Sequence, residues 1–279
     1  MAITNISFVP SGGLGNRMMA VASAYTLVNR VLGGGKMKIF WFRDWALNAP
    51  FSSIFLPFHA DNIALYEQSF KHLLLNDRPR RKNFYLPLLP EMIHYDRRIN
   101  EDEVYRLGKE NFDFGQWAEG KNCWMSGFSK FEDFDDSLYS QLFKPVSEID
   151  EKVKALTSDF TDHTFGFHIR RTDHAISIAE SPTQMFIDKA KECIDTYPDC
   201  RLFLATDDEK VKQEFRQLFG AHLITSPDAA SRNSIEGIRG GAAEMWSLAK
   251  TAQIYGSLRS TFSILASKIG AIPLIVLKR

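Results

Sequence analysis

The strongest constraint on the fold is the regular alternation of strand-like and helical segments in the second half of the chain. Short apolar runs that resemble strands occur at 164–169, 201–206, 222–225 and 272–279. Segments with apolar residues at spacings of three and four, as in helices, occur at 181–198, 207–220, 242–256 and 260–270. This alternation predicts a doubly wound sheet, with parallel strands and helices on both faces.

The first half of the chain opens in the same way and then becomes less regular. Residues 5–9 resemble a strand, residues 16–32 have the helical pattern, and residues 36–42 resemble a second strand. This order is typical of a parallel α/β sheet. Residues 43–145 are rich in aromatic residues and prolines, and there we expect one further strand, at 122–128, among irregular substrate-specific loops.

A domain boundary is expected close to Pro145, because a proline disfavours helix at the residue before it. We therefore expect two α/β domains, at residues 1–145 and 146–279. A helix that begins at Ser181 is also expected, with Ser181 as its N-cap and Gln184 completing a capping box.

Composition excludes several classes of function. Lys+Arg and Asp+Glu are both 34, so the formal net charge is +0, which argues against bulk nucleic-acid binding. The three cysteines form no C-x-x-C pair and are expected to be reduced, without a metal. We see no signal peptide and no apolar run of about 18 residues, and we expect a cytoplasmic protein.

The segment GGLGNRM at 12–18 follows the first expected strand and opens a helix. Glycines such as Gly13 and Gly15 allow backbone N–H groups to approach an anion at a helix N-terminus. A dinucleotide fingerprint would require a third glycine where Met18 stands, and an acidic residue well before Asp44. A tight turn is a second alternative, but the pattern favours close approach to a ligand that is not a dinucleotide.

The segment HIRRTD at 168–173 closes an expected strand with two adjacent arginines. His168 and Arg170 share one side of the strand, whereas Arg171 points the other way or lies in the loop. Two guanidinium groups suit a pyrophosphate, and Asp173 could orient one of them. The alternative is a cluster of surface salt bridges, which contributes little to stability.

Two other junctions between a strand and a helix carry polar residues. Asp207 follows the strand at 201–206 and is either an ordinary N-cap or a carboxylate that binds a base or a ribose. Ser260, Thr261 and Ser263 open the helix at 260–270, as ordinary caps or as ligands of a phosphate. All these junctions could converge on one nucleoside diphosphate.

With these motifs in place, the chain resembles the GDP-fucose-dependent fucosyltransferases, the superfamily of α1,2-, α1,6- and protein O-fucosyltransferases. The resemblance covers both ends of the chain and hardly the middle. HIRRTD and LATDD are most similar to the α1,6 branch, whereas the short length and the GGLGN start are closer to bacterial α1,2-type enzymes. The matching pieces are GGLGNRM, HIRRTD, FLATDD, GIRGG and STFS.

The resemblance implies a GT-B architecture, with two Rossmann-like domains that face each other across a cleft. The domain at 146–279 would hold the GDP-sugar, and the domain at 1–145 would face the acceptor. It implies inverting transfer of fucose to a glycan hydroxyl in carbohydrate biosynthesis, with no metal and no cofactor beyond the donor substrate. A peripheral position at the inner face of a membrane is compatible with this function.

The resemblance also implies a role for each matching residue. Arg170 would contact the β-phosphate and Arg171 would brace the loop, while His168 and Asp207 would hold guanine or ribose. The general base would be Glu180, at an unusual spacing, or else Asp173 or His174. The diphosphate would be bound by Ser260, Thr261, Phe262 and Ser263. The site would be closed from the acceptor side by Gly15 and Asn16.

Three other functions remain as alternatives to fucosyl transfer. They are a GT-B transferase for another nucleotide sugar, an NAD(P)-binding oxidoreductase that uses GGLGNR, and a catalytically inactive protein that binds a nucleotide sugar.

Overall fold

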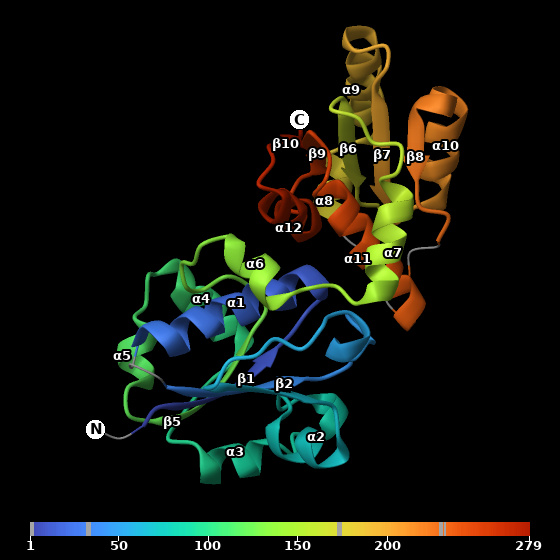
Figure 1. The fold of residues 1–279 in the computed structure, drawn as a ribbon. Coiled ribbons are helices and arrows are strands. Elements are labelled where there is room, and N and C mark those ends of the chain that lie inside the picture. The colour runs from blue at the N-terminus through green and yellow to red at the C-terminus, as the bar shows by residue number, and fades with distance from the viewer. Residues whose placement is uncertain (1–2, 32–34, 172–174, 229–230, 232) are drawn as a thin grey trace. The chain divides into compact units, whose positions relative to one another are not determined.

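The computed structural model describes residues 3–31, 35–171, 175–228, 231 and 233–279, without the side chains of residues 176 and 177 (Figure 1). The chain divides into two compact units, Met1–Lys144 and Pro145–Arg279. Each unit is built on one five-stranded sheet, and all strand pairs in both sheets are parallel. The expected α/β class with two Rossmann-like sheets is confirmed.

The first unit has the strand order β3-β2-β1-β5-β4. Its strands are β1 (Asn5–Pro10), β2 (Lys36–Trp41), β3 (Ile63–Glu67), β4 (Arg97–Ile99) and β5 (Asn122–Gly127). Its helices are α1 (Leu14–Val31), α2 (Phe70–Asn76), α3 (Leu88–His94), α4 (Glu101–Lys109), α5 (Phe114–Ala118) and α6 (Ser137–Leu142). In Figure 1, α1 and α6 lie on one face of the sheet, and α2 and α3 lie on the other.

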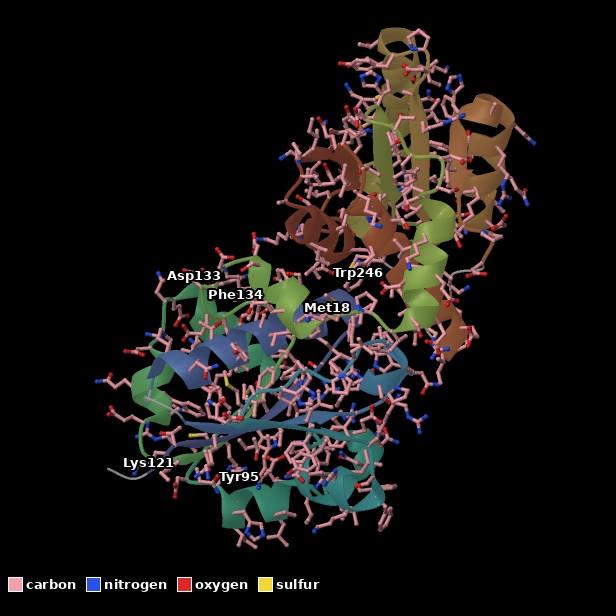
Figure 2. The ribbon with its side chains drawn as sticks, in the orientation of Figure 1. Met18, Tyr95, Lys121, Asp133, Phe134 and Trp246 are labelled. Carbon is pink, nitrogen blue, oxygen red and sulfur yellow. The ribbon has the colours of Figure 1, made fainter. Side chains whose placement is uncertain are left out.

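Burial on both faces explains why β1 is an almost continuous apolar run. Phe8 and Val9 are both buried, as is usual for a parallel strand that has helices on each side. Met18 and Val21 of α1 are also fully buried (Figure 2). The helix begins at Leu14, two residues earlier than the sequence predicts.

The middle of the chain is more regular than we expected. The predicted strand at 122–128 is confirmed as β5, but β3 and β4 were missed. β4 has only three residues, and β3 is half-exposed at the edge of the sheet, so neither has the apolar signature of a buried strand.

The second unit has the strand order β10-β9-β6-β7-β8. Its strands are β6 (Thr164–Ile169), β7 (Arg201–Thr206), β8 (Leu223–Thr225), β9 (Gln253–Ser257) and β10 (Leu274–Leu277). Its helices are α7 (Ser147–Leu156), α8 (Ala175–Glu180), α9 (Thr183–Thr196), α10 (Glu209–Phe219), α11 (Ile235–Leu248) and α12 (Thr261–Gly270).

Side chains of β6 alternate between two helical layers. Phe167 and Ile169 belong to a core cluster with Phe186 of α9 and Phe215 of α10. Gly166 faces the opposite layer, where an added Cβ would lie 2.8 Å from Leu248 of α11. His168 has the same parity as Gly166, so the strand directs it towards the layer of α11 and α12.

Two local predictions in this unit were wrong. The predicted helix at 242–256 is α11, which begins at Ile235 and ends at Leu248, and Gln253–Ser257 is the strand β9. Ser181 is not an N-cap, because α9 begins after Pro182 without a side-chain cap. The Ser181 hydroxyl instead donates to the Leu277 carbonyl at 2.6 Å and accepts from the Leu258 N–H at 2.9 Å.

Each sheet has a topological switch point, at which the strand order reverses beside the first strand of the unit. It lies between β1 and β5 in the first unit and between β6 and β9 in the second. Open α/β sheets bind ligands beyond the carboxyl ends of their strands at such points. None of the described helices is long and apolar enough to cross a membrane.

Candidate functional site

The segment 168–171 lies at the switch point of the second unit, where hydrogen bonds join three strand ends. The Arg170 N–H donates to the Ser257 hydroxyl at 3.1 Å, and that hydroxyl lies 3.3 Å from the His168 carbonyl. The Arg171 N–H donates to the Asp207 carboxylate at 2.7 Å. The ends of β6, β7 and β9 are therefore held together around these residues.

The two aspartates after β7 have different roles. Asp208 is the N-cap of α10, because its carboxylate accepts a hydrogen bond from the Lys210 N–H at 2.8 Å. Asp207 is therefore not the helix cap, and it lies next to the segment 168–171 instead. The prediction that Asp207 is an ordinary N-cap is therefore wrong, because Asp208 is the N-cap of α10.

His168 is buried and stacks on Phe262 of α12, with ring centroids 4.7 Å apart and an interplanar angle of 19°. Burial lowers the pKa of His168 to about 4; Asp207 acts in the opposite direction and Arg170 in the same direction. The imidazole is thus neutral at physiological pH. Its Nδ1 atom is buried and has no hydrogen-bond partner in the part of the chain that the structure describes.

Ser260 is the N-cap residue of α12, but its side chain makes no capping hydrogen bond. Its hydroxyl is buried and has no partner among the described residues, whereas the Ser263 hydroxyl lies 3.3 Å from the Ser260 carbonyl. A buried polar atom without a partner is uncommon and unfavourable. Two such atoms occur beside the same switch point, one from His168 of β6 and one from Ser260 at the start of α12.

The side chain of Arg171 makes its hydrogen bonds within the protein. Its guanidinium donates to the Ser181 carbonyl at 2.7 Å, to the Thr183 hydroxyl at 3.0 Å and to the Arg170 carbonyl at 2.9 Å. These contacts tie residues 170 and 171 to the start of α9, and Arg170 itself is half-buried.

The predicted general bases are only partly placed. Asp173 and His174 lie outside the described residues. Glu180 is the last residue of α8 and is exposed, and its carbonyl accepts a hydrogen bond from the Arg279 N–H at 2.9 Å. Among the residues that the structure describes, no hydrogen bond or ion pair joins the Glu180 carboxylate to the segment 168–171.

Glu244 of α11 is a candidate that the sequence analysis missed. It is buried, and burial raises its pKa to about 8, with Lys212 opposing the shift and Asp228 and Asp207 adding to it. The Lys212 ammonium lies 3.9 Å from the carboxylate. The only signal in the sequence is an acid inside the apolar stripe AAEMWSL.

The Gly-rich segment lies at the switch point of the first unit. The Ser11 N–H donates to the Gly127 carbonyl at 2.9 Å, which joins the ends of β1 and β5. Gly12 has φ +83°, a conformation that favours glycine. Gly13 precedes α1, and Gly15 and Asn16 lie in its first turn.

Arg17, in the same helix, is fully buried and saturated with contacts. Its Nε donates to the Gly12 carbonyl at 2.8 Å, and one terminal nitrogen pairs with Asp44 at 3.0 Å. The guanidinium also lies 5.0 Å from the centre of the Trp41 ring. Burial lowers its pKa to about 10, so it stays charged at neutral pH.

The ion network continues beyond Arg17. Asp44 also accepts from Arg78 at 3.0 Å, and Arg78 pairs with Glu101 at 2.7 Å. The basic segment RPRRK at 78–82 thus contains two ion-paired arginines, Arg78 and Arg80, because Arg80 pairs with Asp77. Because Asp44 is occupied by arginines, it is not available to a ribose, which argues against the dinucleotide alternative.

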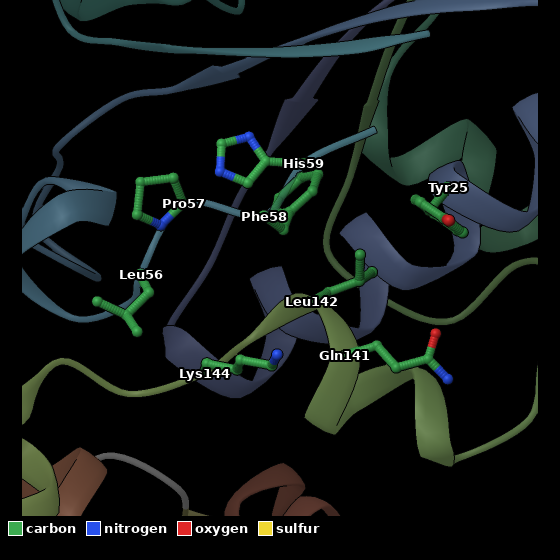
Figure 3. Close-up of a pocket in the computed structure, with 8 residues that line it drawn as sticks. All are labelled: Tyr25, Leu56, Pro57, Phe58, His59, Gln141, Leu142 and Lys144. Atoms are coloured by element: carbon green, nitrogen blue, oxygen red, sulfur yellow. The ribbon is translucent and has the colours of Figure 1, made fainter. Parts of the chain in front are cut away.

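A cavity of about 250 Å³ lies in the first unit (Figure 3), and none of the predicted site residues lines it. Its lining comes from α1, α6, the loop at 56–59 and Lys144: Tyr25, Leu56, Pro57, Phe58, His59, Gln141, Leu142 and Lys144. Within the described ranges, no group of three or more His, Cys, Asp or Glu side chains could hold a metal ion.

Solved structures share this fold. NodZ α1,6-fucosyltransferase soaked with GDP-fucose matches with a TM-score of 0.67 and 20% identity, over 96% of this chain and 92% of that one. The chain has the fold of a fucosyltransferase. NodZ from Bradyrhizobium, a Se-Met structure, matches equally well in fold, with a TM-score of 0.67 and 19% identity over 95% and 92% of the two chains.

More distant structures agree. POFUT1 in complex with GDP-fucose has a TM-score of 0.56 and 10% identity, over 98% of each chain. A mutant of Arabidopsis thaliana FUT1 in complex with GDP has a TM-score of 0.60 and 14% identity, over 99% of this chain and 70% of that one. No family model and no curated protein matches the sequence.

Proposed function

We propose that this protein is an inverting, metal-independent fucosyltransferase that transfers fucose from GDP-fucose to a hydroxyl of a glycan. The observation that carries the proposal is the switch point of the second unit. There His168 of the segment 168–171 and Ser260 at the start of α12 each have a buried polar atom with no partner among the described residues, in a fold shared with a transferase soaked with GDP-fucose.

The diphosphate would bind between the β6 end and the start of α12. Arg170 supplies a guanidinium, which matches phosphate oxygens well. Ser260, Thr261 and Ser263 supply hydroxyls at the N-terminus of α12, where the helix dipole favours an anion. The Ser260 hydroxyl would gain the hydrogen bond that it lacks in the structure. Phe262 would hold His168 in position by stacking.

The nucleoside would bind on the side of β7. The neutral His168 and the carboxylate of Asp207 can accept or donate hydrogen bonds to a base or a ribose. Glu244 adds a buried carboxyl group whose pKa Asp207 helps to raise. Guanine presents two adjacent N–H donors, which the Glu244 carboxyl group, largely protonated in the free protein, would accept together once it loses its proton on binding.

The chemistry requires stabilisation of the leaving GDP. As the sugar–phosphate bond breaks, negative charge grows on the β-phosphate and the sugar becomes oxocarbenium-like. Arg170 binds that charge more strongly in the transition state than in the ground state, and this difference accelerates the reaction. Attack by an acceptor hydroxyl from the opposite side inverts the anomeric centre, with Glu180 or Asp173 as its base.

The expected domain at residues 1–145 would bind the acceptor, with Gly13, Gly15 and Asn16 at its switch point. A glycan acceptor, an α1,2 or α1,6 linkage, a cytoplasmic site of action and a role in carbohydrate biosynthesis belong to the same proposal. The proposal includes no cofactor besides the donor substrate.

The test is release of GDP from a panel of nucleotide sugars, with a mixture of glycan acceptors, with and without EDTA. We expect turnover of GDP-fucose that exceeds that of GDP-mannose and UDP-sugars and that EDTA does not reduce. GDP should raise the Tm and NAD should not. Loss of activity in EDTA contradicts metal independence, and GDP binding without turnover favours an inactive binding protein.

A further inference from the structure

Helix α3 presents its apolar side chains to solvent and its acid to the protein. Leu88, Leu89, Met92 and Ile93 are spaced so that they share one face of a helix, and all four are exposed. Glu91, on the other face, is only 2% exposed. A surface helix normally has the opposite arrangement, with its polar face outward. Something other than water is therefore expected to cover this helix.

The exposed apolar surface extends beyond the helix. Phe84 and Tyr85, just before α3, are 82% and 55% exposed. Both have positive φ, 53° and 57°, which is unfavourable for bulky residues. Phe70 of the neighbouring helix α2 is 79% exposed. About half of the exposed large apolar side chains in the described residues lie between Phe70 and Ile93. We call residues 70–93 the α3 surface (Figure 1).

The exposed charges of the α3 surface all have the same sign. Its two acids, Asp77 and Glu91, are both 2% exposed, whereas Lys71, Arg81 and Lys82 are exposed. Burial also raises the pKa of Glu91 to about 8, so this acid is largely uncharged at neutral pH. The whole chain has a formal net charge of +0, so this local excess of cations is not a general property of the protein.

We propose that the α3 surface docks on a lipid bilayer that contains anionic headgroups. An apolar face flanked by Lys and Arg is the arrangement with which helices bind at a membrane interface. The aromatic tip at Phe84 and Tyr85 suits the boundary between headgroups and acyl chains. A symmetric dimer through this surface would instead bring together the same excess of cations from both copies, without an exposed acid of this surface to pair with them.

The first experiment is co-sedimentation of the full chain with vesicles of phosphatidylcholine alone or with phosphatidylglycerol. We expect binding to the mixed vesicles that weakens as salt increases. Phe84→Ser combined with Leu89→Ser should reduce it more than tenfold, because two large apolar groups no longer enter the interface. Arg81→Gln combined with Lys82→Gln should reduce it by about thirtyfold on anionic vesicles. The control, Tyr197→Ser with Leu218→Ser in the second unit, should bind like the wild type.

The second experiment locates the contact. The three native cysteines are free and buried, so an added surface cysteine can be labelled selectively. An environment-sensitive fluorophore on Leu89→Cys should shift to the blue with mixed vesicles, and the same label on Leu218→Cys should not. A shift at neither position, or equal shifts at both, overturns the proposal.

The remaining outcome separates the bilayer from a protein partner. If the wild type is a dimer by light scattering and Leu89→Ser makes it monomeric without any binding to vesicles, the surface is an interface between copies and the proposal is wrong. The inference does not depend on the proposed transferase activity, because vesicle binding is measured without donor or acceptor.

Discussion

The two switch points differ in how the buried polar side chains beside them are satisfied. In the first unit, Arg17 is buried and donates to two backbone carbonyls and to Asp44, and the network continues through Arg78 to Glu101. In the second unit, the buried His168 and Ser260 each have a polar atom without a partner. The two sheets have similar topology, so the difference lies in the side chains rather than in the fold.

This difference separates scaffold from binding site. A buried cation with a full set of acceptors fixes the backbone around it and has nothing left for a ligand. A buried atom without a partner is unfavourable in the free protein, and this cost is recovered when a ligand supplies the missing bond. We therefore expect changes at the first switch point to alter folding, and changes at the second to alter binding and turnover.

The largest effect is expected for Arg17→Ala. The change leaves Asp44 without one of its two arginines and empties a fully buried site, so it should lower the free energy of unfolding by about 3–5 kcal/mol. Denaturant unfolding measures it. Arg106→Ala, which removes an exposed pair with Glu110, is the control and should cost about 0.5 kcal/mol or less. A loss at Arg17 as small as at Arg106 would show that the network is dispensable.

Arg170→Ala tests the second switch point. It should lower kcat for GDP-fucose by about 10²–10³, the scale expected for removal of one preorganised charge donor. Its free energy of unfolding should change much less than that of Arg17→Ala. Arg216→Ala, at an exposed pair with Glu209, should have wild-type turnover. Near-wild-type kcat in Arg170→Ala contradicts the assigned role.

Most strands that are buried on both faces were predictable from sequence. β1, β6 and β7 are nearly continuous apolar runs, and each was recognised. β9 was missed because the helical spacing of Met245, Leu248 and Ala249 continues to Ala252, beyond the real end of α11. Periodicity alone does not mark where a helix stops when the next strand is also apolar.

The candidate site was predictable only in part, for a related reason. Residues that follow a strand, such as Arg170 and Asp207, are visible as polar residues after an apolar run. Glu244 is not, because it reaches the region from the middle of a helix that is distant in sequence. Likewise, the sequence does not show that Arg78 would be neutralised by Asp44 and Glu101, since those pairs depend on tertiary contacts.

A pH series sharpens the comparison through His168. The folded-state pKa is lowered to about 4 from an ordinary value of 6.5, so the unfolded chain binds more protons between these values. Stability from this group is therefore lost as the pH falls from about 6.5 to about 4, up to about 3 kcal/mol. Glu244, with a raised pKa, has the opposite slope between about 4.5 and 8. The pH dependence of wild-type stability therefore does not separate the contribution of His168 from that of Glu244.

The difference between variants does isolate His168. His168→Asn lacks this loss, so its free energy of unfolding, measured with denaturant from pH 7 to pH 4, should rise relative to that of the wild type as the pH falls. His94→Asn, at an exposed position, is the control and should show no such trend. A constant difference across this range would mean that His168 keeps an ordinary pKa.

The smallest effects are expected for removal of two serine hydroxyls, one at each switch point. Ser126 in the first unit donates to Glu101 at 2.6 Å, whereas the Ser260 hydroxyl has no partner. Ser126→Ala should lower the free energy of unfolding by about 1 kcal/mol and leave GDP affinity unchanged. Ser260→Ala should leave the free energy of unfolding unchanged or slightly higher, and it should weaken GDP binding about tenfold, as measured by calorimetry. If both serines affect only stability, the unpaired hydroxyl is a packing feature and the diphosphate binds elsewhere.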